Sequence, residues 1–359
     1  MQRILMIGPF PDPISGVSLA NQVVKDILIQ ENKFKVQIIN TSYPYFDEKV
    51  GKFSFQKFFF FLSLNFKVFK VFKNQIIYIT PGQTFFGITK YTLYILIASI
   101  FKKELIIHVH GNHLGKEYEL LRGIKKRLFY YLNSQFTKGI VLSDSLKNNL
   151  IPFVKEESIF SLPNFAENYL FETENNKDYD EMRVVYLSNL MKEKGIISLL
   201  HALKEMEGLG GVLYRAKIAG NIDDDSATEI QNLISELQNC EYIGVVKGEE
   251  KKELLNWGNV FVLPTFYKME GQPISILESL ATGNVIITTK HAGIPDIIQD
   301  GVHGYFVKKN SSSSLAESLL RLYKNKDEIK RIGLSNKRYF LNNFTISIFR
   351  NKLLEILSK

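Results

Sequence analysis

Two glutamates, Glu270 and Glu278, stand eight positions apart shortly after the apolar run Phe261–Leu263. The run is typical of a buried strand, and a helix is expected to begin near Pro273. A carboxylate accepts hydrogen bonds from two vicinal hydroxyls, and the free N–H groups of a helix start suit a sugar hydroxyl or a phosphate. The alternative is structural: one charge matches the helix dipole and the other is solvated.

The elements that must position these groups alternate short β-rich runs with longer helical patterns. Such alternation predicts βαβ units on parallel sheets, whose ligands bind at the carboxyl ends of the strands. We therefore expect two doubly wound domains that face each other across a cleft. The expected strands are Arg3–Ile7, Phe34–Asn40, Gln75–Thr80, Glu104–His110, Ile140–Ser143, Ile159–Leu162, Val184–Leu187, Tyr214–Ala219, Tyr242–Gly244, Asn259–Leu263 and Val285–Thr288. The main expected helices are Leu19–Glu31, Phe53–Lys73, Gly87–Phe101, Ile124–Asn133, Ser198–Met206 and Ala227–Gln238.

A polar, acidic stretch over residues 166–182 has the composition of an exposed connection between domains. The predicted organisation is a first domain over residues 1–165, this linker, and a second domain over residues 183–340. The closing residues 341–359 are expected to form an amphipathic helix that packs back toward the first domain. The serine run at 311–314 is expected to cap the start of a helix near Leu315.

Several motifs follow one another in the order seen in a known family. They are the strand and loop Val184–Gly195 ending in Glu-Lys-Gly, then Ile218-Ala219-Gly220, Tyr242-Ile243-Gly244, the Glu270 to Glu278 spacing, and Gly293-Ile294-Pro295-Asp296 through Gly304. Over about 130 residues this order resembles the family-4 glycosyltransferases of the GT-B fold, which have two Rossmann-like domains. The resemblance implies that the first domain binds the acceptor and the second binds a nucleotide-sugar donor.

Position by position, the resemblance implies a role for each matching residue. Glu278 looks like the carboxylate that binds the nucleotide ribose, and Glu270 like the one beside the donor sugar. Lys194 looks like the lysine that neutralises the diphosphate, where a fixed cation stabilises the charge that grows on the leaving phosphate. The family commonly has an arginine where this chain has Asn189, which donates a hydrogen bond but brings no charge. The remaining expected donor-binding residues lie between the two glutamates: Gly271, Gln272, Pro273 and Ile274.

In the first domain, His110 ends a β-rich run and precedes Gly111. It resembles the family's histidine that contacts the donor sugar near the reacting carbon, although a strand-end histidine taken alone is more often structural. We interpret His110 as catalytic, together with Lys194 and Glu270. His108 is expected to point to the opposite face of the strand and to be structural.

The first βα turn, residues 8–17, is too long and proline-rich for the dinucleotide fingerprint. It looks like the family's glycine loop, in which Gly16 allows backbone N–H groups to approach a phosphate. A plain tight turn is the alternative, because the family more often has two glycines where this chain has Ser15-Gly16. Asp12 and Asn112 are candidates for contact with the acceptor.

Asp223-Asp224-Asp225 resembles the metal-binding motif of another glycosyltransferase fold, but it precedes an expected helix, where acids are favoured. We therefore interpret it as structural and expect neither a metal site nor a cofactor.

The stretch Phe53–Lys73 combines many phenylalanines with lysines. It is expected either to lie on an anionic membrane surface or to form a core helix with its lysines extended to solvent. Both interpretations stay open.

The composition is that of a globular chain: 359 residues, 45% hydrophobic, with a net charge of +8. That charge suits an anionic partner, and no nucleic-acid motif is present, so nucleic acid is not expected. The single cysteine, Cys240, favours a reducing compartment. The apolar start is too short for a signal peptide, and Thr92–Phe101 is too short to span a bilayer. We expect a cytoplasmic protein, and a peripheral position on the inner face of the membrane stays open.

The resemblance implies transfer of a sugar from a UDP- or GDP-sugar to a glycan hydroxyl with retention of anomeric configuration. The expected acceptor is an O-antigen or capsule unit on a polyprenyl diphosphate. Two other classes stay open: a nucleotide-sugar epimerase or glycan phosphorylase on the same fold, and a non-catalytic glycan-binding protein.

Overall fold

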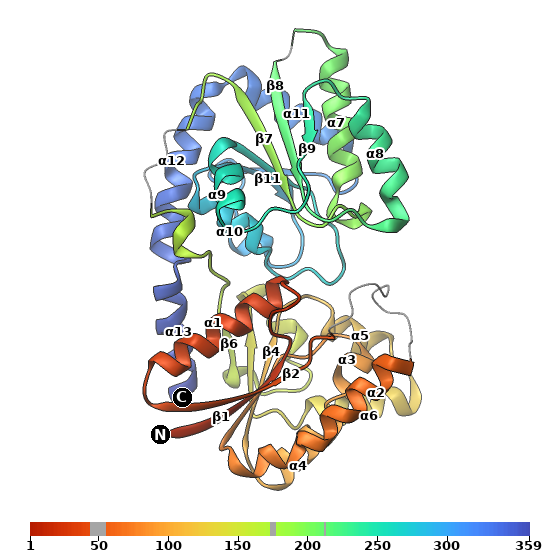
Figure 1. Cartoon of the computed structure of the whole chain (residues 1–359), viewed down its shortest axis with the longest axis vertical. Helices are drawn as coiled ribbons and strands as arrows, with labels where there is room; N and C mark the ends of the chain where they lie inside the picture. Colours follow the sequence, from red (N-terminus) through yellow and green to blue (C-terminus); the bar gives the residue numbers. More distant parts are fainter. Residues whose placement is uncertain (44–54, 173–176, 212) are drawn as a thin grey trace. The chain divides into compact units, whose positions relative to one another are not determined.

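The computed structural model describes residues 1–43, 55–172, 177–211 and 213–359. The chain forms two compact units, each built around its own sheet (Figure 1). The first unit comprises Met1–Pro163 together with Arg350–Lys359, and the second comprises Asn164–Phe349. Two Rossmann-like units of this kind were expected from the alternating pattern, and this part of the prediction is confirmed.

The sheet of the first unit is parallel, with strand order β2-β1-β3-β4-β5-β6. Its strands are β1 (Gln2–Gly8), β2 (Phe34–Asn40), β3 (Ile76–Ile79), β4 (Glu104–Val109), β5 (Lys138–Val141) and β6 (Ile159–Ser161). The side chains of β3 are all buried, as the run Ile-Ile-Tyr-Ile predicts for a strand covered on both faces. The chain changes its direction of winding between β1 and β3, so ligand groups are expected after these two strands.

The helices of the first unit depart from expectation in two places. They are α1 (Gly16–Gln30), α2 (Phe55–Leu64), the 3₁₀ helix η1 (Asn65–Lys73), α3 (Phe85–Thr89), α4 (Thr92–Ile100), α5 (Leu114–Leu120) and α6 (Gly123–Asn133). The helix expected over Gly87–Phe101 is wrong as a single element, because α3 and α4 are separate. The helix expected over Phe53–Lys73 is likewise two elements, and residues 53 and 54 lie outside the described part of the chain.

The change from α2 to η1 has a sequence explanation in the repeat Phe-Lys-Val that begins at Phe66. A repeat of three residues matches the 3.0 residues per turn of a 3₁₀ helix, so each residue type forms its own ridge. Val71, on the valine ridge, is fully buried. The phenylalanine ridge is exposed: Phe66, Phe69 and Phe72 expose 80%, 54% and 48% of their surface.

The sheet of the second unit is also parallel, with strand order β12-β11-β10-β7-β8-β9. Its strands are β7 (Met182–Leu187), β8 (Tyr214–Ala219), β9 (Cys240–Tyr242), β10 (Val260–Leu263), β11 (Val285–Thr289) and β12 (Gly304–Val307). The five expected strands are present, with β9 shifted toward the N-terminus, and β12 was not expected. In this order the winding reverses between β7 and β10, which are neighbours in the sheet.

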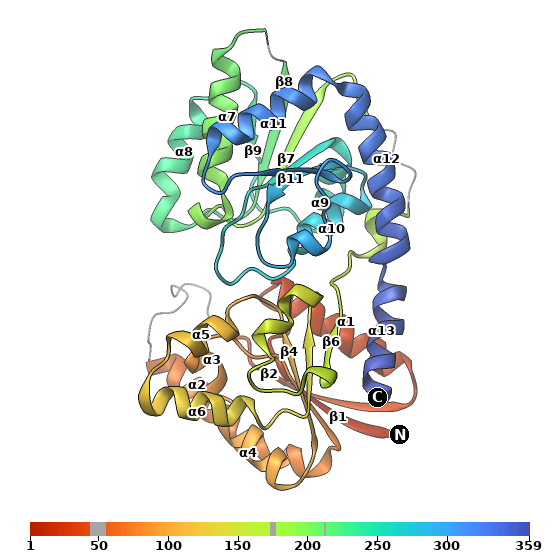
Figure 2. The ribbon, with the colours of Figure 1, turned by 180° about the vertical axis from the view of Figure 1, so that it is seen from behind.

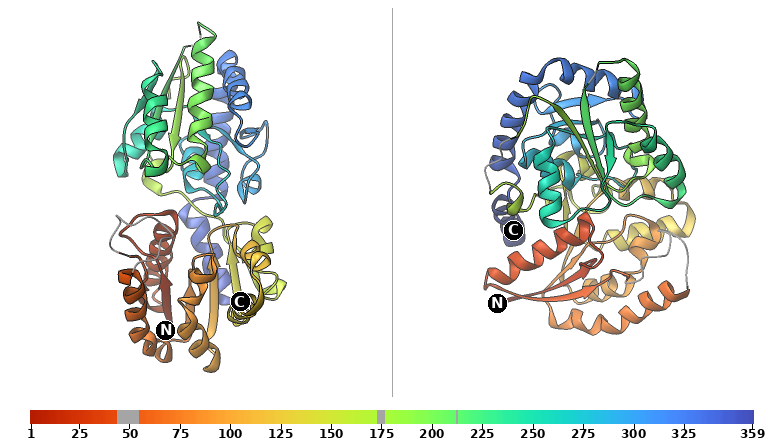
Figure 3. Two further views of the ribbon diagram at one scale, coloured as in Figure 1. Left: turned by 90° about the vertical axis from the view of Figure 1, so that its right-hand side faces the viewer. Right: turned by 45° about the horizontal axis from the view of Figure 1, so that its top comes forward.

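Helices cover both faces of the second sheet, as the views in Figures 2 and 3 show. They are α7 (Ile196–Gly208), α8 (Ala227–Ser235), α9 (Gly248–Trp257), α10 (Ile274–Ala281), α11 (Ser312–Lys324) and α12 (Lys326–Asn343). The predicted serine cap is confirmed, because the Ser311 hydroxyl accepts a hydrogen bond from the Ser314 N–H at the start of α11. The core is continuous through this unit and includes Phe261, Leu277 and Leu319, all fully buried.

The stretch 166–182, predicted to be an exposed linker, belongs to the second unit and is partly buried in it. Leu170 is fully buried, and the Lys177 ammonium donates to the Leu255 carbonyl and to the Asn284 side chain. Burial lowers the pKa of Lys177 well below its ordinary value, and the positive charge of Lys337 lowers it further. Residues 173–176 lie outside the described part, and a linker role for this stretch remains a prediction.

The last helix, α13 (Ile346–Ser358), returns to the first unit from Arg350 onward. Its Arg350 guanidinium pairs with the Glu31 carboxylate, and the Ile356 carbonyl accepts a hydrogen bond from the Lys138 ammonium. Leu353 and Leu357 are buried, as the amphipathic pattern predicts. In the described part of the chain, no helix has the length and apolar character needed to cross a bilayer.

Candidate functional site

The loop that carries Lys194 follows β7 and is held against the end of β10. Gly195 has φ +82°, and a Cβ atom at this position would lie 2.5 Å from the Pro264 carbonyl oxygen. Only glycine fits such a backbone at such a distance. The Glu193 carbonyl accepts a 2.8 Å hydrogen bond from the Phe266 N–H, which ties the two loops together. The Glu-Lys-Gly motif thereby places Lys194 at the carboxyl end of the neighbouring strand.

Lys194 and Glu270 meet at this point of the sheet. The Lys194 ammonium lies 2.6 Å from Glu270 Oε2, and the Thr265 hydroxyl donates to the same oxygen at 3.1 Å. The side chains are only 15% and 9% exposed, so the pair is largely shielded from water. The Lys194 ammonium also lies 5.1 Å from the centre of the Tyr267 ring. Shielding strengthens the pair electrostatically and keeps the cation in a defined place.

Glu278 lies in α10 and is also buried, at 4% exposed surface. Its Oε1 accepts a 2.5 Å hydrogen bond from the Lys251 ammonium, which comes from the first turns of α9. Glu167, from the stretch expected to be a linker, lies 3.7 Å from the same ammonium. Burial alone lowers the pKa of Lys251, but the Glu278 carboxylate outweighs it and raises that pKa above its ordinary value.

The alternative interpretation of the two glutamates, a dipole-matched charge beside a solvated one, is therefore wrong. Both carboxylates are buried, and each is paired with a lysine from a different element. Buried ion pairs cost desolvation free energy and are weak contributors to stability, so their presence here favours a functional explanation.

Local hydrogen bonds hold the residues between the two glutamates in place. The Gly271 carbonyl accepts a 2.9 Å hydrogen bond from the Gly293 N–H, and Pro273 precedes the first residue of α10, Ile274. Gln272 is buried and bonds to Asn164, whose N–H donates to the Gln272 side-chain oxygen at 2.7 Å. This contact is structural, and donor binding by these four residues remains a prediction.

Asn189 lies in the exposed loop after β7. Its carbonyl accepts a hydrogen bond from the Tyr186 hydroxyl at 3.2 Å, while Tyr186 itself is buried in the strand. Asn189 is thus held by its backbone, and its predicted role toward the diphosphate stays a prediction.

His108, in β4, and His110, directly after this strand, lie on the same side of it, and the prediction that His108 points to the opposite face is wrong. Residues two apart in a strand share a face. Accordingly, the rings of His108 and His110 lie 4.0 Å apart between centres. The Tyr78 hydroxyl lies 2.5 Å from His108 Nδ1 and anchors this ring from β3.

Burial keeps both imidazoles neutral near pH 7. It lowers the pKa of His110 to about 4. Burial, and in second place the charge of His110, lowers the pKa of His108 well below its usual range. The Nε2 atoms of both rings are buried without a hydrogen-bond partner in the described part of the chain. A neutral His110 suits hydrogen bonding to a ligand rather than service as a fixed cation.

The other candidates of the first unit lie at the ends of β1 and β4. Gly16 is the first residue of α1, where Ser15 caps the helix and accepts from the Ser18 N–H at 3.1 Å. Asp12 is exposed in the loop before it. The Asn112 side-chain oxygen accepts a 3.2 Å hydrogen bond from Asn149, which holds the loop after β4. Ligand contacts by Gly16, Asp12 and Asn112 remain predictions.

The acidic run Asp223–Asp225 lies directly before α8, where it was expected as a structural feature. The Asp223 N–H donates to the Leu190 carbonyl, so the run also fastens the loop after β7. Within the described ranges, no group of three histidine, cysteine, aspartate or glutamate side chains is arranged to hold a metal ion.

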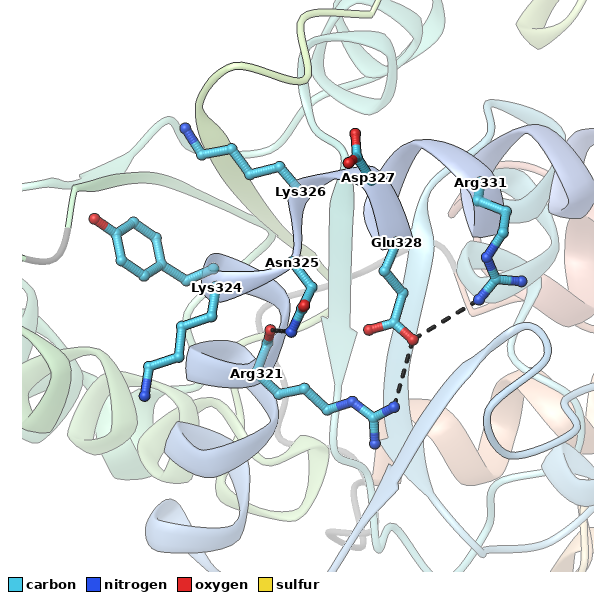
Figure 4. A pocket seen from close by; sticks show the side chains of 8 residues that line it. Arg321, Lys324, Asn325, Lys326, Asp327, Glu328 and Arg331 are labelled. Atoms are coloured by element: carbon cyan, nitrogen blue, oxygen red, sulfur yellow. Dashed lines mark hydrogen bonds and ion pairs between the residues drawn. The ribbon is translucent and has the colours of Figure 1, made fainter.

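A pocket at the junction of α11 and α12 contains none of the predicted site residues (Figure 4). Its lining residues are Arg321, Tyr323, Lys324, Asn325, Lys326, Asp327, Glu328 and Arg331. Glu328 draws both arginines inward, at 3.4 Å from Arg321 and 3.8 Å from Arg331, and it accepts from the Tyr305 hydroxyl. Because both arginines pair with Glu328 and no predicted site residue lies here, we assign no ligand to this pocket.

Three residues near the candidate groups were missed from the sequence: Lys251, Glu167 and Tyr78. Lys251 belongs to α9, a helix that was expected after Tyr242–Gly244 but without bounds, and it lies in a run of mixed charges that is typical of a solvated helix. Glu167 lies in a stretch whose acidity suggested a linker. Nothing in the sequence indicated a role for Tyr78 beside a histidine, since an aromatic residue in an apolar strand usually belongs to the core.

Comparisons with known proteins bear on the family and the fold. Residues 170–338 match the family described as Glycosyl transferases group 1. The amylovoran biosynthesis glycosyltransferase AmsK of Erwinia amylovora is 26% identical over 187 residues, which cover 50% of this chain and 46% of that protein. The capsular polysaccharide biosynthesis glycosyltransferase CapM of Staphylococcus aureus is 26% identical over 259 residues, 67% of each chain. The chain thus spans about half the length of the first of these relatives.

Among solved structures, Anabaena HepE in complex with UDP and glucose has a TM-score of 0.75 with 15% identity, over the whole of both chains. At this identity the likeness concerns the fold. Residues 170–338 thus match the family described as Glycosyl transferases group 1, and the chain has the two Rossmann-like units of the GT-B fold.

Proposed function

We propose that this protein transfers a sugar from a nucleoside-diphosphate sugar to a hydroxyl of a glycan, with retention of the anomeric configuration. The observation that carries the proposal is the shielded Lys194–Glu270 pair at the point where the winding of the second sheet reverses. Open α/β sheets bind nucleotides at such points. A lysine held there can meet a diphosphate, and a carboxylate beside it can accept from sugar hydroxyls.

In the proposed reaction, Lys194 stabilises the negative charge that grows on the leaving phosphate as the bond to the anomeric carbon breaks. Glu270 orients the donor sugar through its hydroxyls, and the neutral His110 hydrogen-bonds to the sugar near the reacting carbon. None of these residues is needed as a covalent nucleophile. The departing phosphate itself takes the acceptor proton on the same face of the sugar, which leaves the configuration unchanged. The proposal requires no metal ion, because Lys194 supplies the cation.

A uridine or guanosine diphosphate is the proposed leaving group. HepE was solved with UDP and with UDP-glucose, and its fold matches this chain along the whole length. Glu278, on α10 beside the end of β10, is the group we propose for the ribose, as the Glu-x₇-Glu signature implies.

The proposed acceptor is a surface polysaccharide unit of the O-antigen or capsule type, carried on a polyprenyl diphosphate. The support is the naming of AmsK and CapM, which serve amylovoran and capsular polysaccharide biosynthesis. A lipid-linked acceptor requires the enzyme to work at a membrane surface, and on this proposal it acts as a peripheral protein on the cytoplasmic face.

The contact proposed for the membrane is the phenylalanine ridge of η1. Phe66, Phe69 and Phe72 point to solvent, with Lys67 and Lys73 exposed beside them. Phe101, at the end of α4, extends the ridge through an edge contact with Phe72 at 4.8 Å between ring centres. Aromatic side chains next to lysines suit the interface of an anionic bilayer. The alternative, a core helix whose lysines alone reach solvent, does not explain why the phenylalanines are exposed.

Thermal unfolding with UDP, GDP and ADP, followed by transfer assays with the sugar nucleotides of the base that binds, tests the proposal. A binding nucleotide raises the stability by about 2.7 kcal/mol at 100 times its Kd. Transfer of labelled sugar to a polyprenyl-diphosphate glycan, with the anomeric configuration read by NMR, is the expected result.

Controls in the same assay separate the other classes. Isomerisation of the donor without acceptor would indicate an epimerase, and release of a sugar phosphate from glycan and phosphate would indicate a phosphorylase. If no nucleotide stabilises the protein and no sugar is transferred, the proposed function is wrong and glycan binding without catalysis takes its place.

A further inference from the structure

The cluster around Lys251 contains two carboxylates, Glu278 and Glu167, and one ammonium. One ammonium stands between Glu278 Oε1 at 2.5 Å and Glu167 Oε2 at 3.7 Å, with the Tyr169 ring centre 5.7 Å away. The Lys251 and Glu278 side chains are only 15% and 6% exposed. A shielded group with surplus negative charge repels a phosphate and favours neutral ligands that donate hydrogen bonds.

The geometry of the pair fits a hydroxyl in particular. Lys251 occupies Oε1 of Glu278, while no described residue donates a hydrogen bond to Oε2 of that carboxylate. Of the three donors of the Lys251 ammonium, one goes to Glu278 and a second to the Tyr169 hydroxyl, so the third remains for a ligand. A hydroxyl both donates and accepts. One hydroxyl next to the pair can therefore donate to Glu278 and accept from Lys251 at the same time.

We propose that Lys251 is a specificity-determining residue of the donor site, which binds one ribose hydroxyl of the nucleotide jointly with Glu278. This inference rests on the proposed function. It adds a second lysine to the site: Lys194 binds the diphosphate, and Lys251 hydrogen-bonds to the ribose. These different roles follow from the carboxylates around each lysine. Among the described residues, one carboxylate lies within 4 Å of the Lys194 ammonium and two lie within 4 Å of the Lys251 ammonium.

Glu167 gives the subsite a means of holding Lys251 in place. When Glu278 is neutralised by substitution, Glu167 still lies 3.7 Å from the ammonium, so Lys251 keeps a counter-charge. The variant Glu278→Gln is therefore expected to retain part of the hydroxyl recognition, namely the bond donated by Lys251. Such residual recognition is what distinguishes a direct contact from a lysine that only orients Glu278.

The experiment measures the Kd of UDP, 2′-deoxy-UDP and 3′-deoxy-UDP by calorimetry, for wild type and for Lys251→Met, Glu278→Gln and the double variant. Wild type is expected to bind one deoxy analogue roughly 10- to 100-fold more weakly than UDP, because a hydrogen bond to a charged group is lost. Glu278→Gln is expected to keep a smaller ratio, and adding Lys251→Met to it is expected to bring the ratio close to one.

Lys252→Met is the matched control, since Lys252 is the next residue of α9 and pairs with Glu249 at 3.0 Å instead. Its ratio is expected to equal that of wild type. Thermal unfolding of each variant checks that it is folded, and the double variant, with no unpaired charge at either position, serves where a single variant is unstable.

Two results overturn the inference. If Lys251→Met leaves the ratio of Kd values unchanged in the Glu278→Gln background, Lys251 acts only through Glu278 or through the fold. If the wild-type protein binds UDP and both deoxy analogues with equal Kd, the site does not hydrogen-bond to a ribose hydroxyl. Absence of binding by UDP, GDP and ADP to wild type is a different outcome, which removes the proposed function and this inference together.

Discussion

At the scale of single residues, the shielded pair of Lys194 and Glu270 couples stability to the proposed catalysis. Each charge is kept in a largely buried position by the other, with the Thr265 hydroxyl as an additional donor. Removal of one partner leaves an uncompensated charge, which is more damaging than removal of both. Catalysis, in contrast, needs the ammonium itself.

Lys194→Ala is expected to lower turnover by about 100-fold or more, because a preorganised cation at the leaving group is lost. It is also expected to lower the free energy of unfolding by about 3 kcal/mol, because Glu270 stays buried without its partner. The double variant Lys194→Ala/Glu270→Gln should regain most of the stability and none of the turnover. Steady-state kinetics and urea unfolding measure the two effects, and wild-type turnover in Lys194→Ala would refute the assigned role.

His110 makes stability depend on pH. Its pKa in the folded protein is about 4, below the ordinary value near 6.5, because burial disfavours the charged ring. The unfolded chain therefore binds a proton between these values that the folded chain does not, so stability falls as pH decreases through this window. His110 is expected to account for about 2 kcal/mol of lost stability between pH 7.5 and pH 5.

Urea unfolding of wild type and His110→Asn at both pH values checks this expectation. The variant should lose less stability on acidification than wild type, by roughly that amount. An equal loss in both proteins would show that His110 already takes up a proton in the folded state. Between pH 7.5 and pH 5, the pH–activity profile should show no change that arises from protonation of His110.

At the scale of elements, the start of α7 decides where Lys194 lies. Gly195 has a left-handed backbone and touches the Pro264 carbonyl, so the loop after β7 and the end of β10 share one tight contact. Gly208, the last residue of the same helix, has open space around the position of a Cβ atom.

Gly195→Ala is expected to destabilise the protein by about 1–3 kcal/mol and to lower turnover, since strain and overlap at this point displace the Lys194 loop. Gly208→Ala is the control and is expected to be neutral or slightly stabilising, because alanine is the better helix former. Thermal unfolding and turnover, measured side by side, give the comparison. Equal effects of the two substitutions would contradict the role given to the Gly195 contact.

At the scale of the whole molecule, the ridge of η1 is expected to bring the protein to anionic membranes. In liposome flotation, wild type should bind vesicles that contain anionic lipid and should be released by salt. Lys67→Glu/Lys70→Glu should lower binding by about 30-fold, at about 1 kcal/mol for each lost lysine near the surface. Phe66→Ser/Phe69→Ser should weaken the contact at high salt as well.

The control replaces Lys324 and Lys330 by glutamate, since both are exposed in the second unit and give the same change of net charge. Binding of this control should stay close to that of wild type. If all variants and wild type float equally, η1 does not contact the membrane, and the exposed phenylalanines need another partner.

Local sequence patterns were sufficient for most of the fold. Strands such as Phe34–Asn40 and Tyr214–Ala219 were predicted to the residue, because apolar β-rich runs between polar turns have few other structures available. The pattern failed where its period was misread: the repeat of three residues from Phe66 belongs to a 3₁₀ helix, not to an α-helix. The edge strand Gly304–Val307 was missed because four residues are too few to form a clear pattern.

By itself, the sequence determined the two doubly wound units and the order of motifs by which the chain resembles the family-4 glycosyltransferases. Both depend on local spacing. Only the tertiary structure decided which lysine meets which glutamate: Lys194 and Glu270 are 76 positions apart, and Lys251 and Glu278 are 27 apart. The physical reason is that the order of the strands and the packing of the helices bring these partners together. Both depend on contacts between residues far apart in the sequence, which local patterns do not reveal.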